Sequence, residues 1–319
     1  MTLETPVALI IFRRPEHTRR VFERIAVARP RTLLIIGDGP RGDDPEEVAR
    51  VAETRAITQR VDWPCNLMTN FAEDNLGLKR RIMSGLQWVF DNVEEAIILE
   101  DDCVAEPTFF FYCRELLERY REDHRIATVS GENHQNGLRR TPYSYFFSKY
   151  FQCSGWATWR RVWDEFDLGM KTWPEFHDAG AMRSIAETPV EQKYWTKIFQ
   201  SVYDGEVNGW GAAWQYYCWQ TNALTINPEV NLITNIGYGG DATHTKSVNE
   251  NLANLPTQPL TDLRHPPFFV PHKEADRMTY QRIHGKRPFF KKWTRSVMKR
   301  LPVLKRRFEP KPRIESAAA

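Results

Sequence analysis

Three adjacent acids, Glu100, Asp101 and Asp102, directly follow an apolar run at residues 96–99. Buried carboxylates in such a row repel one another unless a cation or hydrogen-bond donors neutralise them. Hard divalent ions such as Mg²⁺ and Mn²⁺ prefer oxygen ligands and often bridge carboxylates to substrate phosphates. This acidic triplet therefore predicts a site for a divalent cation and a diphosphate, and the alternative is a solvated loop before the helix expected from Pro107.

Short apolar runs in the first 130 residues predict strands, and the stretches between them predict helices. The predicted strands lie at residues 7–12, 32–36, 66–71, 96–99 and 126–130, and the predicted helices at 17–27, from 44–45 onward, at 78–91 and at 107–121. Such an alternation is typical of a parallel sheet with helices on both faces. We therefore expect an α/β, Rossmann-like fold whose ligands bind at the carboxyl ends of the strands.

Polar residues follow three of these predicted strands. Arg13 and Arg14 follow the first, Asp38 lies between two glycines after the second, and the acidic triplet follows the fourth. None of these places contains GxGxxG or GxxxxGK[ST], so the phosphate-cradling glycines of dinucleotide-binding folds and P-loops are absent. A response-regulator-like phosphoacceptor domain also has acids at strand ends, but it leaves the aromatic-rich second half of this chain without a role.

Three motifs follow one another in the sequence: AIILEDDCVAEPTFF at residues 96–110, VSGENHQNG at 129–137 and YFQCSGW at 150–156. In this order they resemble the GT-A glycosyltransferases, in particular bacterial relatives of N-acetylglucosaminyltransferase I. The resemblance spans about residues 6 to 245 and implies a mostly parallel GT-A sheet flanked by helices. It implies a nucleotide-sugar-binding half at residues 1–137, an aromatic-rich acceptor half at 138–255 and a C-terminal extension with a basic tail at 256–319.

The resemblance also implies roles for single residues in a donor site for a UDP-sugar. Asp102 corresponds to the direct ligand of Mn²⁺ or Mg²⁺, and Glu100 and Asp101 face the ribose and the sugar. Asp38 is expected to bind the uracil ring, and Arg14 and Lys79 to lie near the nucleotide and diphosphate. The residues alone leave two alternatives open, a turn-stabilising Asp38 and a solvated Lys79.

The expected reaction is an inverting transfer of a hexosyl or N-acetylhexosaminyl group to a saccharide acceptor in surface glycan assembly. A metal-bound diphosphate leaves more easily, and a carboxylate base takes the proton of the attacking hydroxyl. In the relatives this base follows a tryptophan, but here Gly211 stands at that place. The remaining candidates are Asp204, Glu206 and Asp241, with His244 near the diphosphate or metal; the alternative is a non-catalytic nucleotide-sugar or carbohydrate-binding protein.

Aromatic residues crowd the acceptor half. Eight of the eleven tryptophans lie between Trp156 and Trp219. Exposed aromatic rings suit the apolar faces of sugars or a lipid-linked acceptor, which makes Trp156, Trp210 and Trp214 candidate acceptor-binding residues. A second aromatic core packed on the sheet is the alternative interpretation.

Basic residues gather at the end of the chain. Residues 286–313 contain twelve Lys and Arg and a single acid, Glu309, although the net charge of the whole chain is only +3. Together with nearby aromatic and aliphatic residues, this charge predicts adsorption to an anionic membrane surface. RNA binding and a solvated tail are the alternatives, and nucleic acid is the less favoured partner.

The remaining composition indicates a folded protein in a reducing compartment. No apolar run approaches the roughly 18 residues of a membrane span, and no signal peptide is recognisable. The five cysteines are scattered without a CxxC pair, which favours reduced thiols over disulfides or a zinc site. The sequence therefore predicts a cytoplasmic protein, peripheral at the inner face of the cytoplasmic membrane if the tail binds there.

Overall fold

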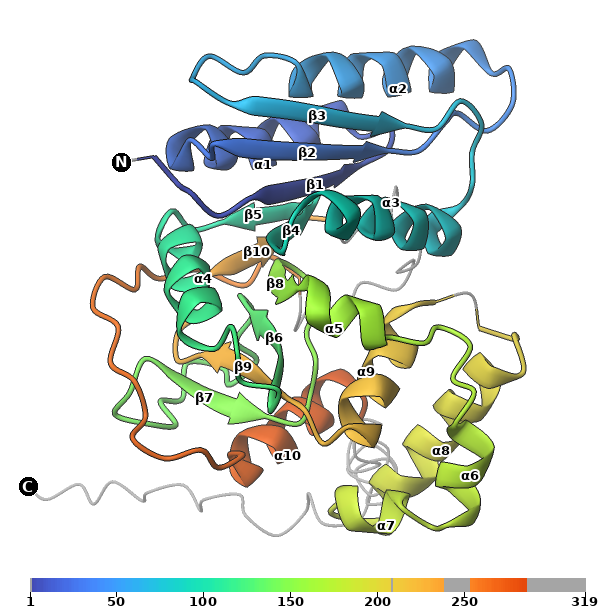
Figure 1. The fold of residues 1–319 in the computed structure, drawn as a ribbon, viewed down its shortest axis with the longest axis vertical. Helices are drawn as coiled ribbons and strands as arrows, with labels where there is room; N and C mark the ends of the chain where they lie inside the picture. The colour runs from blue at the N-terminus through green and yellow to red at the C-terminus, as the bar shows by residue number, and fades with distance from the viewer. Residues whose placement is uncertain (1, 208, 238–252, 286–319) are drawn as a thin grey trace, which may run out of the picture. The chain divides into compact units, whose positions relative to one another are not determined.

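The computed structural model describes residues 2–207, 209–237 and 253–285, and its central element is a sheet of eight strands (Figure 1). The strands, in their order across the sheet, are β3 (Asn66–Phe71), β2 (Thr32–Gly37), β1 (Val7–Ile11), β4 (Glu95–Glu100), β8 (Trp156–Trp159), β6 (Ile126–Ser130), β9 (Leu224–Pro228) and β7 (Tyr145–Ser148). The chain divides into two units, Met1–Ile283 and His284–Ala319, and all of these strands lie in the first.

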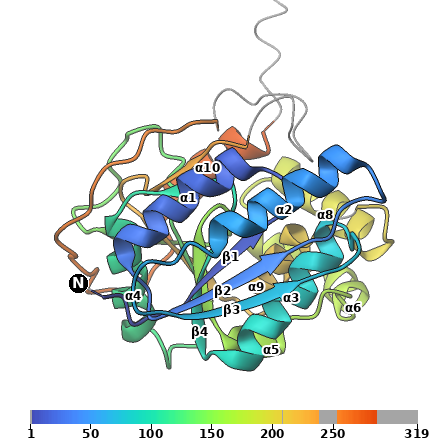
Figure 2. The ribbon, with the colours of Figure 1, turned by 90° about the horizontal axis from the view of Figure 1, so that it is seen from above.

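The first four strands are parallel, as expected from their near-continuous apolar sequences. Register pairs such as Val7↔Leu33 and Leu9↔Leu99 place β1 in the middle of this parallel part, where every residue of β1 is buried. Helices α1 (Pro15–Ala28) and α2 (Pro45–Thr58) lie on one face and α3 (Leu78–Asn92) on the other (Figure 2). The prediction of an α/β fold with a mostly parallel sheet flanked by helices is confirmed.

Local signals explain where the early helices begin. Asp44 caps α2 by accepting a hydrogen bond from the Glu46 amide at 3.2 Å, and Pro45 follows at the first helical position. Both features favour a helix start. Helix α4 (Thr108–Arg119) likewise begins directly after a proline, close to the predicted start.

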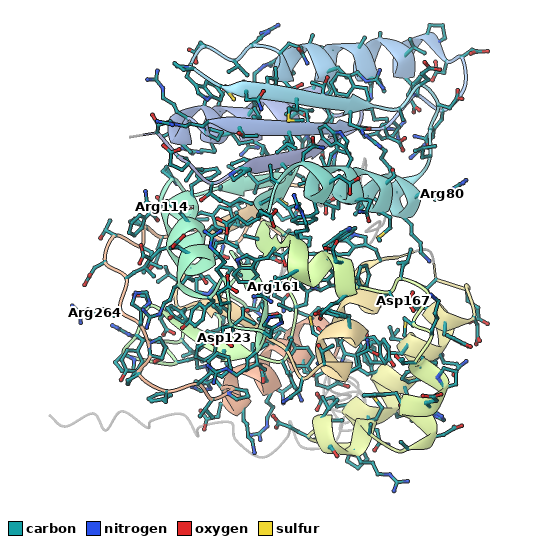
Figure 3. The ribbon with its side chains drawn as sticks, viewed as in Figure 1. Arg80, Arg114, Asp123, Arg161, Asp167 and Arg264 are labelled. Atoms are coloured by element: carbon teal, nitrogen blue, oxygen red, sulfur yellow. The ribbon has the colours of Figure 1, made fainter. Side chains whose placement is uncertain are left out.

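The second half of the sheet is mixed. Strand β8 runs antiparallel to both of its neighbours, with pairs Ile98↔Trp156 toward β4 and Val129↔Ala157 toward β6. Strands β6 and β9 therefore point in the same direction as β4. Arg161, in α5 (Arg160–Glu165), donates to four carbonyl oxygens between residues 120 and 126 and so fastens α5 beside the start of β6 (Figure 3).

Most of the tryptophan-rich region between residues 156 and 219 is helical. The described part contains α6 (Trp173–Asp178), α7 (Met182–Ile185), α8 (Pro189–Tyr203) and α9 (Gly211–Gln220) here. The last seven residues of α9 before Gln220 are all buried. A helix that is apolar and buried on all sides has no amphipathic periodicity to reveal it in a sequence.

The tryptophans of this region are core residues. Trp156, Trp210 and Trp214 have 1%, 6% and 0% of their surfaces exposed. Trp156 stacks on Trp210 with ring centroids 5.5 Å apart and meets Trp214 edge-on at 5.1 Å. Because other rings cover them, the prediction that these three tryptophans present open faces to an acceptor is corrected to the alternative of a second aromatic core.

A small antiparallel ladder joins β5 (Cys103–Ala105) to β10 (Ile233–Asn235) and brings a distant segment beside the acidic triplet. Glycines permit the close approach of β10. A Cβ on Gly131 or Gly155 would lie 2.5 Å from side-chain atoms of Ile233, and Gly155 adopts a φ of +66°. The glycine of the Gly155-Trp156 motif therefore makes room for β10, while its tryptophan packs in the core.

Helix α10 (Lys273–Ile283) ends the first unit. No helix in the described part of the chain is long and apolar enough to cross a membrane. All five cysteines belong to that part and are free thiols, as the sequence predicted.

Candidate functional site

A pocket of about 560 Å³ opens at the edge of the sheet where β1, β2 and β4 end. Arg14, Asp38, Glu100 and Asp101 all line it, because the carboxyl ends of parallel strands meet at one edge of a sheet. The structure thus brings together four of the residues that the sequence predicted for one site. We call this hollow the strand-end pocket. Asp102 lies beside it and forms an ion pair with Arg14.

A single guanidinium serves two acids of the triplet. Arg14 forms an ion pair with Asp101 and a second with Asp102, where Nη1 and Oδ2 are 3.1 Å apart. Desolvation, followed by the charges of Asp102 and Asp101, raises the pKa of Glu100 to about 8. Burial also raises the pKa of Asp101 despite its pairing with Arg14. One arginine therefore does not offset three buried acids, which accordingly favour taking up a proton or a cation.

Residues 235–237 cover the triplet from the other side. The amide of Ile236 donates to the Asp102 carbonyl oxygen at 2.9 Å, and the Ile236 carbonyl lies 3.2 Å from His17 Nε2. A Cβ on Gly237 would overlap the Asp102 carboxylate, so glycine is required for this close approach. The candidate residues Asp241 and His244 follow this segment but lie outside the described residues.

Asp38 anchors a loop instead of offering a free carboxylate. Its two oxygens accept hydrogen bonds from the amides of Gly39, Leu76 and Gly77 and from the side chain of Asn75, at 2.8–3.1 Å. Four donors fill the capacity of one carboxylate, and only 6% of Asp38 is exposed. The expected contact with a uracil ring is therefore corrected to the alternative of a turn-stabilising role.

Phe12 and Arg41 provide a planar surface in the same pocket that the sequence reasoning missed. The guanidinium carbons of Arg41 and Arg13 lie 5.2 and 5.6 Å from the centre of the Phe12 ring. Glu47 holds both arginines, through an ion pair with Arg13 and a 2.7 Å hydrogen bond from the Arg41 amide. Aromatic rings and guanidinium planes stack on nucleobases. The position of Phe12 directly after β1, at the edge where ligands bind, was the sequence signal that could have identified it.

The first turns of two helices point into the strand-end pocket. Pro15, Glu16 and His17 of α1 and Leu78 of α3 line it, and neither helix has a side-chain cap. Unpaired amides and the helix dipole make such N-termini favourable places for phosphate. Lys79 lies in the first turn of α3 but is not among the lining residues, so its predicted contact with the diphosphate gains no support.

Glu132 is a buried acid that the sequence analysis did not name as a site residue. It follows β6, is 7% exposed, and accepts a 3.1 Å hydrogen bond from the Ser154 amide while lying 3.6 Å from His134 Nε2. Desolvation raises the pKa of Glu132 to about 7. The hydrogen bonds from Ser154 act to lower this pKa, and the charge of Asp102 adds to the rise. Its place in the VSGENHQNG motif, immediately after a predicted strand, was the available signal.

The other candidate bases are far from this acidic group in the fold. Asp204 caps the carboxyl end of α8, and both Asp204 and Glu206 are exposed and line a hollow that shares no residue with the strand-end pocket. These two predictions are therefore corrected, because the turn after α8 carries their side chains to another surface. Gly211 begins α9 with nothing within 4 Å of where a Cβ would stand.

The donor set fits a divalent cation that is completed by phosphate. Among residues 2–207, 209–237 and 253–285, no three His, Cys, Asp or Glu side chains are placed to hold a metal by themselves. Magnesium sites, however, commonly use one or two carboxylates together with substrate phosphates and water. Asp102, 14% exposed at its side chain, would supply one such ligand, and a cation there would favour the charged form of the neighbouring acids.

Comparison with known proteins finds no matching family model and no matching curated relative. Among solved structures, a UDP-glucose pyrophosphorylase complexed with UDP-glucose shares 8% identity over 52% of this chain and 82% of its own, at a TM-score of 0.30. The 4-diphosphocytidyl-2C-methyl-D-erythritolsynthase of Anaerococcus prevotii DSM 20548 shares 9% identity over 56% of this chain and 84% of its own, at a TM-score of 0.32. Similarity at this level assigns neither a family nor an activity to this chain.

Proposed function

We propose that this protein is a metal-dependent glycosyltransferase that moves a sugar from a UDP-sugar to a saccharide, with inversion. The observation that carries the proposal is the convergence, at one strand-end pocket, of Glu100 and Asp101 with the adjoining Asp102, two helix N-termini without side-chain caps, and the Phe12 surface. Each of these features suits a different part of a nucleotide diphosphate sugar. The ordered motifs that resemble GT-A enzymes support the same assignment.

The parts of the donor are assigned by chemistry. The base stacks on Phe12 beside Arg41, and the diphosphate lies against the first turns of α1 and α3, within reach of Arg14. Asp102 would hold Mn²⁺ or Mg²⁺ together with diphosphate oxygens. The cation would neutralise the charge that develops on the departing UDP.

Glu132 acts as the general base, because Gly211 stands where the resemblance implies a carboxylate. It lies close enough to the triplet for the charge of Asp102 to influence it, and Ser154 and His134 hold its carboxylate in place. In the reaction, the acceptor oxygen forms a bond to the anomeric carbon while the bond from that carbon to the phosphate oxygen breaks. The electron pair leaves with UDP, and the hydroxyl proton moves to Glu132.

The decisive experiment compares Glu132→Gln with Glu95→Gln while UDP release is measured with a panel of UDP-sugars, saccharide acceptors and Mn²⁺. Glu95 is a matched control, because it is a buried acid with a raised pKa at the opposite end of β4. We expect Glu132→Gln to lower kcat by about 100-fold or more, as for loss of a general base, with little change in UDP affinity. Glu95→Gln should keep kcat within a few fold.

Two results would count against these assignments. Equal activity of Glu132→Gln and the wild type would remove Glu132 from the reaction but leave transfer intact. Donor binding without turnover by the wild-type protein would instead favour a non-catalytic nucleotide-sugar-binding protein. This is the second candidate, because Gly211 supplies no carboxylate and nothing else lies within 4 Å of where its Cβ would be.

A further inference from the structure

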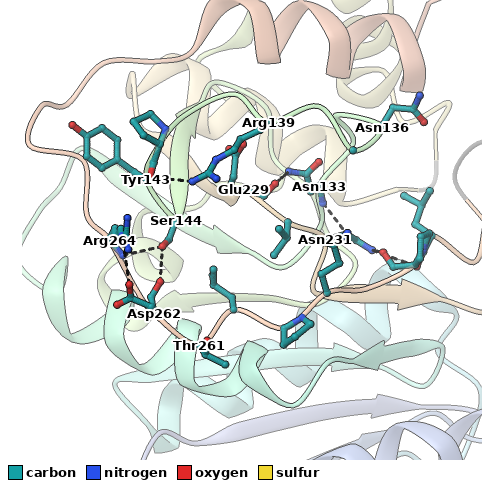
Figure 4. Close-up of a pocket in the computed structure, with 18 of the residues that line it drawn as sticks. Asn133, Asn136, Arg139, Tyr143, Ser144, Glu229, Asn231, Thr261, Asp262 and Arg264 are labelled. Carbon is teal, nitrogen blue, oxygen red and sulfur yellow. Dashed lines mark hydrogen bonds and ion pairs between the residues drawn. The ribbon is translucent and has the colours of Figure 1, made fainter.

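A second cavity, of about 750 Å³, lies at the same edge of the sheet, beyond the ends of β6 and β9 (Figure 4). Asn133 comes from the segment after β6, and Glu229 and Asn231 come from the segment after β9. Residues 255–262 form a further wall. We call it the amide cavity, because asparagine and glutamine side chains line it, and it shares no lining residue with the strand-end pocket.

The frame of the amide cavity is held by hydrogen bonds. The Asn133 side chain donates to the carbonyls of Pro228 and Glu229 at 2.7 and 2.9 Å, and Asn231 Oδ1 accepts from the Asn133 amide at 3.0 Å. The Asn231 side chain also donates to the Ile233 carbonyl at 2.7 Å. These bonds fix the cavity walls before a ligand binds, which lowers the entropic cost of binding.

Other polar groups on the cavity wall have unused hydrogen-bonding capacity. Within the described residues, the side-chain amides of Asn136 and Gln258 and the hydroxyl of Tyr143 have no protein partner, and Glu229 Oε2 is buried without one. Arg139 donates only to the carbonyls of Thr141 and Pro142, out of five N–H groups. Because Glu229 Oε2 has almost no accessible surface, the hydrogen-bonding groups open to a ligand are those of the other four side chains.

The chemistry of the lining selects among ligand classes. Two carboxylates, several amides and three guanidiniums (Arg139, Arg264 and Arg282) alternate with Val230, Leu255 and Leu260 and with prolines. A lipid chain would leave these polar groups unpaired, and the mixture of acceptors and donors favours a ligand that both donates and accepts hydrogen bonds. A sugar matches both parts, because each hydroxyl donates and accepts while the carbon–hydrogen faces of the ring pack on apolar surface.

The cavity is also placed to deliver a ligand to the triplet. The chain runs from Asn231, which lines this cavity, through β10 to Asn235 and Ile236 beside Asp102, a path of roughly 13 Å at the usual rise of an extended chain. Glu132 immediately precedes Asn133 in the sequence. Glu132 is thus the chain neighbour of a residue that lines the amide cavity, although it lines neither pocket itself.

We propose that the amide cavity binds the body of an oligosaccharide acceptor and directs one of its terminal hydroxyls toward Glu132. This inference rests on the proposed function, since it names the substrate class for the same reaction. The cavity, of about 750 Å³, has room for more than one sugar ring, which favours an oligosaccharide over a single sugar.

Direct binding tests this assignment separately from transfer. Ligand-observed NMR is recorded for the full chain, with and without UDP, using mono- to tetrasaccharides of glucose, galactose, N-acetylglucosamine and alternating glucuronate with N-acetylglucosamine. We expect at least one oligosaccharide series to bind, and Gln258→Ala and Tyr143→Phe to weaken it about tenfold, the cost of one to two lost hydrogen bonds. The matched control is Gln192→Ala, the same substitution in the hollow beside α8, which should bind normally.

Each outcome separates this inference from the proposed function. Failure of every oligosaccharide to bind, or binding that the cavity substitutions leave unchanged, overturns the assignment of the amide cavity even if UDP binds and UDP-sugars react. Oligosaccharide binding that Gln258→Ala weakens, in a protein that does not bind UDP, would keep the cavity as a saccharide site and overturn the proposed transfer. Unchanged thermal midpoints of the variants show that folding does not account for the loss.

Discussion

Arg14 lies between two carboxylates, and the buried acids around it depend on its charge. Its guanidinium pairs with Asp101 and Asp102, and these charges raise the pKa of Arg14 even though desolvation acts against them. Removing one partner of a buried ion pair is far more costly than replacing the whole pair by apolar groups. The same residue thus supports the fold and, in the proposed reaction, the diphosphate.

We predict that Arg14→Met lowers the free energy of unfolding by about 3 kcal/mol at pH 8, because Asp101 is left buried without a cation. Loss of Arg14 raises the folded-state pKa values of these acids further. An acid with a raised folded pKa contributes stability at low pH that is lost as the pH rises through that pKa, so the loss should be smaller at pH 5. Urea unfolding at both pH values measures this difference.

Arg19→Met is the control for this prediction, because Arg19 forms exposed ion pairs with Glu16 and Glu53. Exposed pairs contribute at most about 1 kcal/mol. An equal loss of stability at pH 5 and pH 8 in Arg14→Met would show that lost packing, and not uncompensated charge, explains its effect.

Among the elements, α10 is fastened to the sheet by a buried acid. Asp276 accepts a 2.5 Å hydrogen bond from the Ser148 hydroxyl at the end of β7, and the Lys149 amide lies 3.4 Å away. Burial raises the pKa of Asp276 to about 7, although these hydrogen bonds and the charge of Lys149 lower it, and Glu187 adds to the rise. Gln135 also binds α10, through the Ala275 carbonyl and the Thr279 hydroxyl.

We predict that Asp276→Asn removes part of the pH dependence of stability. The folded pKa of about 7 lies above the ordinary value of 3.8, so this group stabilises the protein fully below about pH 4 and loses that contribution as the pH rises to 7. The wild-type protein should therefore lose up to about 1.4 kcal/mol per pH unit relative to Asp276→Asn in this window. Parallel curves of unfolding free energy against pH for the two proteins would contradict it.

On the scale of the whole molecule, the first unit ends at Ile283, just before the basic tail that begins at Lys286. The sequence predicts membrane adsorption for that tail, which lies outside the described residues. The strand-end pocket and the amide cavity both lie within the first unit. Folding and donor binding are therefore expected to be separable from membrane binding.

We predict that a chain ending at His284 keeps the UDP affinity and, within a few degrees, the thermal midpoint of the full chain. Only the full chain should sediment with vesicles containing anionic lipid, since each basic residue near the headgroups contributes about 1 kcal/mol. Added salt should release it, because it screens this attraction. Equal sedimentation of both chains would refute the membrane assignment, and retention on RNA alone would favour the alternative partner.

Much of the first half of the fold could be predicted because its strands are buried on both faces. Such strands form continuous apolar runs, as at β1, β2 and β4, and parallel pairing then carries the residues that follow them to a common edge. For this reason Arg14 and the acidic triplet lie together at one edge of the sheet, as their places after strands predicted. The buried helix α9 was missed because it lacks a polar face.

The sequence by itself determined the alternation of strands and helices, the place of the acids at a strand end and the free thiols. Only the tertiary structure decided what each side chain does, because burial and pairing come from segments that are distant in the chain. Asp38 became a loop anchor through residues 75–77, and Trp156 a core residue through Trp210 and Trp214. Glu132 came near Asp102 because the antiparallel β8 pairs with both β4 and β6, so that the carboxyl ends of β4 and β6 lie one strand apart at the same edge, a juxtaposition that no local spacing encodes.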